Sequence, residues 1–380
     1  MILLRNGSNK ISSRIDWLLF AFILPVLFAG LVTMKSFTKE TPFYSHQIIW
    51  ISISLLVFFF CSFVDFRFLK KTKVLVFLFL FFSSLLILLF IVGHTAGGAQ
   101  SWFDFGGFSF QPSDLMKLVV ILVLAKYFSR RHVEIRNVKH IFVSGLYALI
   151  PFGLVFLQPD FGGAMIIFFI WFGMSLVAGI SKRHLLSVVI LAGVVLGGMW
   201  MFSFADYQKN RIKSFLNPLS DIHGSGYNVY QSTIAVGSGQ IFGKGVGFGT
   251  QSKLKFLPEY ETDFIFAAYA EEWGYVGVVL LLVLFGLIIW RILGNAILGS
   301  TNFETLFGIG LAIYFMSHFI INIGMNIGLM PVTGITLPFM SYGGSHLVTE
   351  FLGLGILMGM RNYNRVAHRD DMRNEFLGIQ

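Results

Sequence analysis

Repeated runs of about 20 apolar residues, separated by short polar segments, constrain this chain more than any other feature of its sequence. Each run is long enough for an α-helix to cross the ~30 Å hydrocarbon core of a bilayer, where only helices and closed barrels satisfy every backbone polar group. Hydrophobic residues make up 56% of the chain and charged residues 12%, about half the ~25% usual in globular proteins. The sequence therefore predicts an all-α polytopic membrane protein.

Ten such runs emerge when the chain is read for segments near this length with few charges. They lie near Trp17–Met34, His46–Val64, Val74–Gly93, Pro112–Phe128, His140–Leu157, Phe161–Ile180, His184–Phe204, Phe264–Leu293, Phe303–Gly328 and Gly343–Met360. The eighth run has 30 residues and would be ~45 Å long at ~1.5 Å per residue, so we expect it to tilt strongly or to break near Trp273–Gly274 or at Gly277. If short runs such as the fourth or sixth are re-entrant, the count falls to eight or nine.

Lysine and arginine gather on one side of the predicted membrane. Nineteen of the 28 lie in the N-terminal segment, in alternate loops and in the C-terminal tail, whereas the short opposite loops hold only Lys35 and Lys39. Because loops rich in these residues stay in the cytoplasm, we predict that both termini are cytoplasmic. The chain is then a single transmembrane domain over residues 1–380, with an extracytoplasmic loop at 205–262 and a cytoplasmic tail at 361–380. The net charge of +9 therefore reports topology, and no nucleic-acid partner is expected.

Several protein classes are excluded by single features. The lone cysteine, Cys61, lies in an apolar run, so the chain is not a disulfide-stapled secreted scaffold. Aromatic residues reach 17%, which is too many for a disordered chain. No His and Cys cluster has zinc spacing, and no Gly-x-Ser-x-Gly string marks a hydrolase nucleophile.

Ionisable residues within or beside the spans form a short set. Each costs ~2.5–3.5 kcal/mol on insertion scales, so each is a functional candidate. The set consists of Asp114, Lys117, Asp160, Asp263, Glu271, Glu272, His318, His346 and Glu350. Most of these residues fall at or near the outward ends of the predicted spans. They therefore predict a polar pocket that opens outward.

The start of the fourth span allows two interpretations. Residues 111–117 read Gln-Pro-Ser-Asp-Leu-Met-Lys, so Asp114 and Lys117 share one face of a beginning helix. They are either a self-neutralised ion pair, or a cation that Lys117 offers to an anionic ligand such as pyrophosphate while Asp114 holds it in place. Asp160 follows a proline and caps the next outer helix start, and it becomes functional if it faces the same cavity as Lys117.

Carboxylates at the start of the eighth span also allow more than one interpretation. Asp263 is either a helix cap or a general base, since a carboxylate at the membrane boundary is partly desolvated. Glu271 and Glu272 lie about two turns further along the helix, and we expect them to be deeper. They are interpreted as a buried hydrogen-bonded pair, a route for ions, or the lining of the break near Gly274.

The long outer loop at 205–262 is expected to be a 58-residue excursion without regular structure, a length that is usually functional in a compact protein. It holds Arg211 and the glycine-rich stretch 237–249. Lys244 is followed by Gly245 where a P-loop has Ser or Thr, so a nucleotide site is excluded. Two interpretations remain open: a flexible segment whose backbone approaches a lipid-linked phosphate, or glycines required for packing.

Several strings occur together in the order in which one family carries them. They are Gly98-Ala99-Gln100-Ser101-Trp102, Gln111-Pro112-Ser113-Asp114 with Lys117, Gln158-Pro159-Asp160, Phe256-Leu257-Pro258-Glu259, Thr262-Asp263-Phe264-Ile265-Phe266-Ala267, Glu271-Glu272 with Gly274, Asn322-Ile323-Gly324-Met325 and Pro331-Val332-Thr333-Gly334-Ile335-Thr336-Leu337-Pro338-Phe339-Met340-Ser341-Tyr342-Gly343-Gly344-Ser345. With them the chain resembles the SEDS family (shape, elongation, division and sporulation) over essentially its whole length. Gly249-Thr250-Gln251 and the short tails are more similar to the cell-elongation member than to the division member.

Two positions depart from the family pattern. The family has Arg where this chain has Ser101, and Glu where it has Asp114. Both lie in or just after the second outer loop, so the charge arrangement around Lys117 is altered. Our hypothesis is that the two changes compensate each other, so that restoring either residue alone is more harmful than restoring both.

The resemblance implies a peptidoglycan glycosyltransferase that polymerises lipid II into glycan strands on the outer face of the bacterial cytoplasmic (inner) membrane, during cell elongation and rod-shape maintenance. Asp263 is implied to be the general base, which deprotonates the acceptor's sugar 4-hydroxyl for attack at the donor's anomeric carbon with inversion. The leaving group is undecaprenyl pyrophosphate. The implied substrate-binding residues are Lys117, Asp114, Asp160, Arg211, Lys244, Glu259, Thr262, Ser341 and Ser345.

The resemblance also implies partners. The expected ones are a class B penicillin-binding protein, which is a transpeptidase, and other proteins of the elongation complex. No metal ligand is assigned, and a divalent cation such as Mg²⁺ or Mn²⁺ on the pyrophosphate is the candidate cofactor.

Other functions remain open beside this one. The span count, the buried acids and His318 also suit a transporter that flips lipid II, although no inverted repeat is visible. A non-enzymatic scaffold for the transpeptidase and a division-specific polymerase of the same family are further alternatives. Replacing Asp263 by Asn separates the first two from a polymerase, because only a polymerase needs the base.

Overall fold

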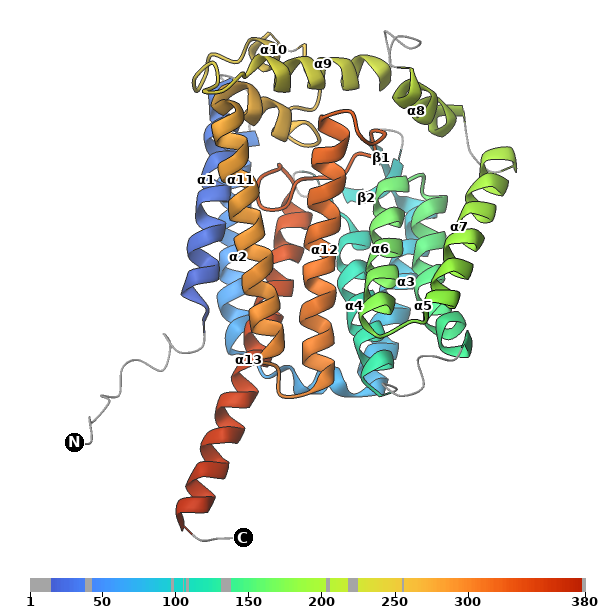
Figure 1. Cartoon of the computed structure of the whole chain (residues 1–380), viewed down its shortest axis with the longest axis vertical. Coiled ribbons are helices and arrows are strands. Elements are labelled where there is room, and N and C mark those ends of the chain that lie inside the picture. Colours follow the sequence, from blue (N-terminus) through green and yellow to red (C-terminus); the bar gives the residue numbers. More distant parts are fainter. Residues whose placement is uncertain are drawn as a thin grey trace, which may run out of the picture.

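The computed structural model describes residues 15–37, 43–96, 99–104, 106, 109–130, 138–202, 206–217, 225–254 and 256–377. Within these ranges, ten helices of 17 residues or more stand side by side (Figure 1). They are α1 (Trp17–Phe37), α2 (Phe43–Phe63), α3 (Thr72–Val92), α4 (Pro112–Ser129), α5 (Val138–Leu157), α6 (Phe161–Val177), α7 (Lys182–Phe202), α11 (Ile265–Ile297), α12 (Asn302–Asn326) and α13 (Gly344–Leu377). Each coincides with one predicted span, and the number of these helices that cross the membrane stays a prediction. The predicted end of the seventh span, Phe204, lies outside the described residues.

Hydropathy explains why these helices form a membrane bundle. Six of them are long and apolar enough by composition to cross a membrane: α1, α2, α3, α5, α11 and α12. Large apolar side chains such as Phe28, Leu56 and Ile91 stay exposed on the outside of the bundle, where lipid is their natural solvent. The centre is formed by α4 and α12, whose residues are mostly buried, and α13 packs along α2 beside them. The protein is a multi-pass membrane protein.

The helix α11 is broken, as its length predicts. Gly274 has φ 65° and ψ −166°, which only glycine adopts readily, and the chain changes direction there. The first part, from Ile265 to Trp273, lies across one end of the bundle, and the part after Gly274 descends through it (Figure 1). The break thus resolves the conflict between a 33-residue helix and a ~30 Å membrane core.

The expectation of an outer loop without regular structure is wrong. Three helices occupy it, namely α8 (Asp206–Leu216), α9 (Ser225–Ser238) and α10 (Thr250–Lys253), and they lie across the same end of the bundle (Figure 1). We call this end the loop face. Parts of the predicted loop, at 203–205, 218–224 and 255, lie outside the described residues. A second buried cluster, which includes Val229, Leu257, Phe264 and Met325, packs α9 against α11 and α12, so tertiary burial and not helix propensity stabilises the outer helices.

A small sheet lies between α3 and α4 near the loop face. The strands β1 (His94–Ala96) and β3 (Ser109–Phe110) each pair antiparallel with β2 (Ala99–Asp104). Gly98 of the predicted motif lies outside the described residues. On the side away from the loop face, the short 3-10 helix η1 (Phe66–Lys70) connects α2 to α3.

The start of α1 and the end of α13 both lie on the side opposite the loop face (Figure 1). There, one oxygen of the Asp16 carboxylate accepts hydrogen bonds from Arg291 Nη2 and Asn295 Nδ2 of α11, both at 2.6 Å, and Arg361 Nη1 of α13 lies 3.8 Å away. Asp16 therefore clamps three helices together at the end of the bundle that is far from α8 to α10.

Candidate active site

Asp263 directly precedes α11 and is held through its backbone. Its carbonyl oxygen accepts hydrogen bonds from the side-chain amides of Asn322 and Asn326, each at 3.0 Å. The neighbouring carbonyl of Thr262 accepts a hydrogen bond of 2.7 Å from the Ser341 hydroxyl. These contacts fix the backbone from both sides and leave the Asp263 carboxylate free to face the segment that contains Gly334. A Cβ on Gly334 would lie 3.6 Å from that carboxylate.

Asn326 connects this backbone to the outer loop. Besides donating to Asp263, its side-chain oxygen accepts from the Ala267 amide at 3.2 Å and from the Ser232 hydroxyl of α9 at 3.3 Å. One buried amide therefore joins α9, α11 and α12 at the proposed base. Neither Asn322 nor Asn326 was predicted to be a functional residue. The feature of the sequence that could have identified them is a pair of asparagines, spaced i and i+4, in an otherwise apolar helix.

The electrostatic surroundings of Asp263 favour a base that works near neutral pH. Burial raises the pKa of Asp263 to about 7, the nearby Glu259 carboxylate adds to this rise, and the positive charge of Arg211 opposes it. Glu259 itself is exposed and accepts a hydrogen bond of 3.2 Å from the Thr262 hydroxyl. A carboxylate with a pKa near the working pH is suited to accept a proton in a transition state.

A small pocket lies near Asp263, whose carboxylate is not part of its lining but faces Gly334, the residue after Thr333 of the lining. It is lined by Phe161, Gln208, Arg211, Ile212, Pro331, Val332 and Thr333. Arg211 comes from α8, and its charge acts on both Asp160 and Asp263, so one cation of the pocket lining influences two carboxylates. The wall between α6 and the segment 331–333 is tight, because a Cβ on Gly162 would lie only 2.6 Å from the Thr333 carbonyl oxygen.

Asp160 caps a helix, which was one of the two roles considered for it. Its carboxylate caps α6 by accepting a hydrogen bond of 2.7 Å from the Gly163 amide, and it also accepts one of 3.2 Å from the Gln111 side chain. Burial raises the pKa of Asp160, against the opposing effect of Lys117. Asp160 therefore lies within electrostatic reach of Lys117, and its functional role stays a prediction, because neither side chain is among the pocket residues.

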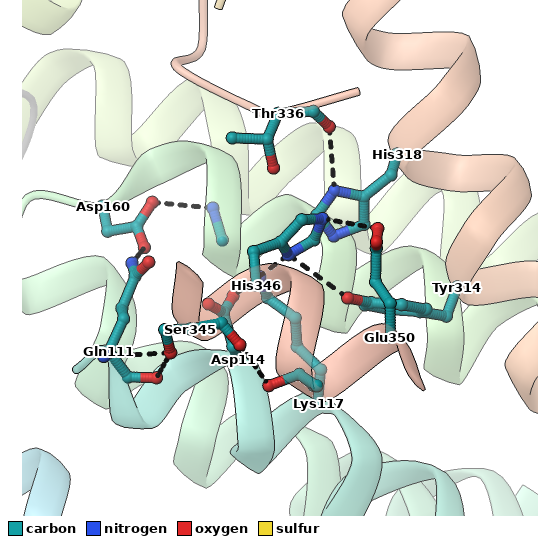
Figure 2. A network of polar contacts seen from close by, with 12 residues as sticks. Gln111, Asp114, Lys117, Asp160, Tyr314, His318, Thr336, Ser345, His346 and Glu350 are labelled. Atoms are coloured by element: carbon teal, nitrogen blue, oxygen red, sulfur yellow. Dashed lines mark hydrogen bonds and ion pairs between the residues drawn. The ribbon is translucent and has the colours of Figure 1, made fainter. Parts of the chain in front are cut away.

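Lys117 and Asp114 belong to a buried charge network (Figure 2). Lys117 Nζ pairs with Asp114 Oδ1 at 2.9 Å, and His346 lies between Asp114 and Glu350, at 3.6 Å and 2.9 Å from their oxygens. Each ring nitrogen of His346 therefore faces a carboxylate oxygen. The network thus alternates basic and acidic side chains from Lys117 to Glu350. All four side chains are nearly fully buried.

The network ends at the segment that carries the last motif. The second Glu350 oxygen accepts a hydrogen bond of 3.0 Å from the Phe339 amide, and Phe339 has φ 61°, which is strained for a residue with a side chain. Ser341 then links this segment to Thr262, and Ser345 accepts a hydrogen bond of 3.2 Å from the Gln111 amide. Ser341 and Ser345, predicted to bind substrate, therefore form hydrogen bonds within the protein that hold the segments of the site together.

Lys244 and the glycine-rich stretch lie elsewhere on the loop face. Lys244 Nζ binds Glu271 Oε1 at 2.7 Å and Thr250 Oγ1 at 2.8 Å, and Lys244 is not among the pocket residues. Glu272 accepts a hydrogen bond of 2.6 Å from the amide of Gly247, which itself lies against the last turn of α1. The prediction that Glu271 and Glu272 lie deeper is therefore wrong, because α11 runs across the loop face before its break. They line the break with hydrogen bonds, which was one of the three interpretations.

Among the described residues, no group of three or more His, Cys, Asp or Glu side chains is arranged to hold a metal ion. Asp160, Glu259 and Asp263 influence one another electrostatically without forming such a group.

Comparison with known proteins gives consistent matches over nearly the whole chain. The family model described as "Cell cycle protein" and named for FtsW, RodA and SpoVE matches residues 13–366. Stage V sporulation protein E of Bacillus subtilis strain 168 is 35% identical over 362 residues, which cover 92% of this chain and 98% of that protein. Peptidoglycan glycosyltransferase MrdB of Escherichia coli strain K12 is 38% identical over 285 residues, which cover 75% of this chain and 77% of that protein.

Two solved structures share the fold. A chain from a structure titled "Structural coordination of polymerization and crosslinking by a peptidoglycan synthase complex" superposes with a TM-score of 0.79 at 32% identity, covering 92% of this chain and 98% of that one. The rod shape determining protein RodA of Thermus thermophilus superposes with a TM-score of 0.69 at 30% identity, covering 92% of this chain and 97% of that one.

Proposed function

The chain belongs to the FtsW, RodA and SpoVE family, and from that membership we propose that it is a peptidoglycan glycosyltransferase that polymerises lipid II. Relatives over most of its length are named peptidoglycan glycosyltransferases, which supports the reaction class. The assignment of lipid II as both donor and acceptor rests on the chemistry of the pocket.

The observation that carries the proposal is the placement of Asp263. Its backbone is fixed by Asn322 and Asn326, while its carboxylate stands near a pocket that contains Arg211. We propose that this carboxylate takes the proton from the acceptor's sugar 4-hydroxyl. The resulting oxygen attacks the donor's anomeric carbon, the bond from that carbon to the pyrophosphate breaks, and the configuration inverts. Such a displacement needs one base and a stabilised leaving group, in contrast to a retaining hydrolase with its second nucleophilic carboxylate.

The cations divide into two groups in this mechanism. Arg211 lines the pocket and is proposed to bind the pyrophosphate, because a guanidinium matches phosphate oxygens with paired hydrogen bonds. Lys117 is buried and paired with Asp114, so its proposed contribution is the electrostatic field at Asp160. Asp160, Glu259 and Thr262 remain proposed contacts for the sugars.

A Mg²⁺ or Mn²⁺ ion on the pyrophosphate would be held mainly by phosphate oxygens, since the described residues provide no cage of three ligands. Such an ion would neutralise charge on the leaving group.

The proposed orientation places the loop face outside the cell. The distribution of lysine and arginine supports cytoplasmic termini in the bacterial inner membrane, and the pocket then opens where lipid-linked sugars await polymerisation. An enzyme at that surface has no nucleotide sugars, so a donor that carries its own pyrophosphate is the fitting substrate.

We also propose a class B penicillin-binding protein as partner, and a role in cell elongation. The likeness to a chain of a peptidoglycan synthase complex that coordinates polymerization and crosslinking supports a transpeptidase partner. The Thermus thermophilus rod shape determining protein supports the elongation role, which relatives named FtsW leave open to the alternative of division.

The second candidate is a lipid II transporter. It is favoured by the buried charge network of Asp114, Lys117, His346 and Glu350 between α4 and α13, since transporters carry such groups inside the membrane.

Polymerisation of labelled lipid II by the purified protein with its cognate transpeptidase tests the proposal. The wild type is compared with Asp263→Asn and with the control Asp104→Asn, which changes an exposed carboxylate on β2. We expect long glycan strands from the wild type and the control, and none from Asp263→Asn although it still binds the transpeptidase. Equal strands from Asp263→Asn would contradict the assignment of the base. If no protein makes strands while lipid II crosses vesicle membranes, the transporter is the function.

A further inference from the structure

The glycine-rich segment, residues 239–249, is fixed to the break of α11. The amides of Lys244 and Gly245 donate to the carbonyls of Glu271 and Glu272, both at 3.0 Å. After the break, the Tyr275 amide donates at 2.8 Å to the Gln240 carbonyl, and the next amide donates to Ile241. The contact is so close that a Cβ on Gly243 or on Gly274 would collide with the backbone of the opposite segment. These glycines therefore serve packing, which was one of the two interpretations of the sequence.

The geometry of α11 gives the height of this segment relative to the membrane. From Tyr275 to Ile297 the helix is ~34 Å long at ~1.5 Å per residue, which slightly exceeds the ~30 Å hydrocarbon core. Tyr275 therefore lies at the membrane boundary on the loop face. Gly247 agrees with this height, because it lies against Ser36 in the last turn of α1. The glycine-rich segment sits at the level of the lipid headgroups.

Its outward side chains are apolar and large. Phe242 is 81% exposed, Phe248 70%, Ile241 60% and Val246 45%. Directly below them, the surface continues with the exposed side chains of α11. These include Tyr275, Val276, Leu280 and Val283. The backbone hydrogen bonds of Tyr275 and Val276 thus join the exposed apolar segment to the start of a helix that also exposes apolar side chains.

The polar groups of the segment are largely satisfied within the protein. Hydrogen bonds to protein atoms occupy the amides of Gly239, Gln240, Gly243, Lys244, Gly245, Gly247 and Phe248. Its one charged side chain, Lys244, is neutralised by the buried carboxylate of Glu271. A segment that enters lipid has to meet its backbone hydrogen bonds without water, and this segment meets most of them.

We propose that the glycine-rich segment is an interfacial membrane anchor, in which Phe242, Phe248, Ile241 and Val246 insert into the headgroup and upper acyl region of the adjoining lipid leaflet. Aromatic side chains favour this boundary. The segment directly follows α9, whose Ser232 binds Asn326 beside Asp263. The anchor therefore fixes the outer helices at a set height over the membrane. It does not depend on the enzymatic activity proposed above.

Spin labelling tests the anchor directly, because Cys61 is the only cysteine and is buried. In a Cys61→Ala background, single cysteines replace Phe242 and, in a second variant, Phe248. Leu280→Cys on α11 gives the reference for lipid, and Lys253→Cys on α10, which is exposed, gives the reference for water. The full chain is reconstituted alone into phosphatidylglycerol and phosphatidylethanolamine vesicles. Collision rates with oxygen, which partitions into lipid, are compared with those of a water-soluble nickel chelate.

We expect labels at both 242 and 248 to collide several times more often with oxygen relative to the nickel chelate than the label at 253, approaching the ratio at 280. A ratio equal to that at 253 would overturn the anchor and place the segment in water. Labels shielded from both reagents would also overturn it, since they would indicate contact with another protein surface, such as a second copy. None of these readings uses lipid II, so failure of the anchor and failure of the proposed function are distinguishable.

Discussion

At the scale of single residues, the proposed base depends on neighbours that hold its backbone and on neighbours that set its proton affinity. The carbonyl of Asp263 is held by two asparagine amides, and the carbonyl before it by the Ser341 hydroxyl. The position of the Asp263 carboxylate is therefore set through its backbone. The proton affinity of this carboxylate is set by burial and by the charges of Glu259 and Arg211. These two contributions can be separated by experiment.

Changing Glu259 to Gln should shift the pH dependence of polymerisation. Asp263 must be deprotonated to act as a base, so activity should rise with pH through the pKa of about 7. Removing the Glu259 charge stabilises the Asp263 carboxylate and lowers its pKa, so half-maximal activity should move to lower pH. The initial rate of strand synthesis from pH 5 to 9 measures this midpoint. An unchanged midpoint would show that Glu259 does not set the proton affinity of the base.

Changing Asn326 to Leu should lower kcat with little effect on KM. The substitution keeps the approximate size but removes the donor to Asp263 and the acceptor for Ala267 and Ser232. Each lost buried hydrogen bond costs ~1–3 kcal/mol, which corresponds to about tenfold or more in rate if it is felt in the transition state. Ser238→Ala, which removes a hydroxyl bonded only within α9, is the control. Steady-state kinetics of both variants at equal folded fraction provide the comparison, and a rise in KM alone would refute a positioning role.

At the scale of secondary structure, the spans were predictable because hydropathy and length are set by the membrane itself. The break of α11 was also predictable, because the apolar run is too long for the bilayer and Gly274 can adopt the backbone conformation that the break requires. The helices α8 to α10 were not predictable, since their polar and glycine-rich sequences have no strong period. They are stabilised by distant partners such as Glu271, whose carboxylate binds Lys244 and the start of α10. The roles of Asn322 and Asn326 could not be predicted for the same reason. Each donates to the carbonyl of Asp263, which is about 60 positions away in the chain.

Changing Gly274 to Ala should destabilise the protein strongly. At φ 65° an alanine is strained, and its Cβ would lie 2.2 Å from the Gly243 amide nitrogen. Gly286→Ala is the matched control, since it lies in the same helix with open space around it. We expect the midpoint of thermal unfolding in detergent, Tm, to fall by about 5 °C or more for the first variant and to stay within about 1 °C for the second. Equal Tm values for both would mean that the break does not require glycine.

At the scale of the whole molecule, the two ends of the bundle differ in function. The loop face contains the pocket, the outer helices and the glycine-rich segment. The opposite end contains the clamp of Asp16, Arg291, Asn295 and Arg361. Stability and chemistry can therefore be altered independently.

Changing Asp16 to Asn should lower Tm without lowering the rate per folded molecule. Burial alone would raise the pKa of Asp16, but hydrogen bonds from Asn295 and Arg291 outweigh it and lower that pKa. The ionised clamp thus contributes stability above the ordinary aspartate pKa of ~3.9, and the contribution is lost as pH falls through the lowered value. The Tm difference between variant and wild type should be largest near pH 7 and shrink in acid. A difference that is constant with pH would show that the Asp16 charge is not what stabilises the clamp.

The buried charge network also bears on how the chain enters the membrane during synthesis. Gln111 and Ser345 meet although they are 234 positions apart, so at ~5–20 residues per second the ribosome takes on the order of ten seconds or more to make the second after the first. Meanwhile α4 carries its own counter-ion, since Asp114 and Lys117 pair at i and i+3, and α13 brings His346 and Glu350 as a second pair at i and i+4. Each helix thus brings a partner for the ionisable side chains that it buries in the network. The hydrogen bond between Gln111 and Ser345 forms only when the last span arrives, so this part of the site is incomplete while the chain is still on the ribosome.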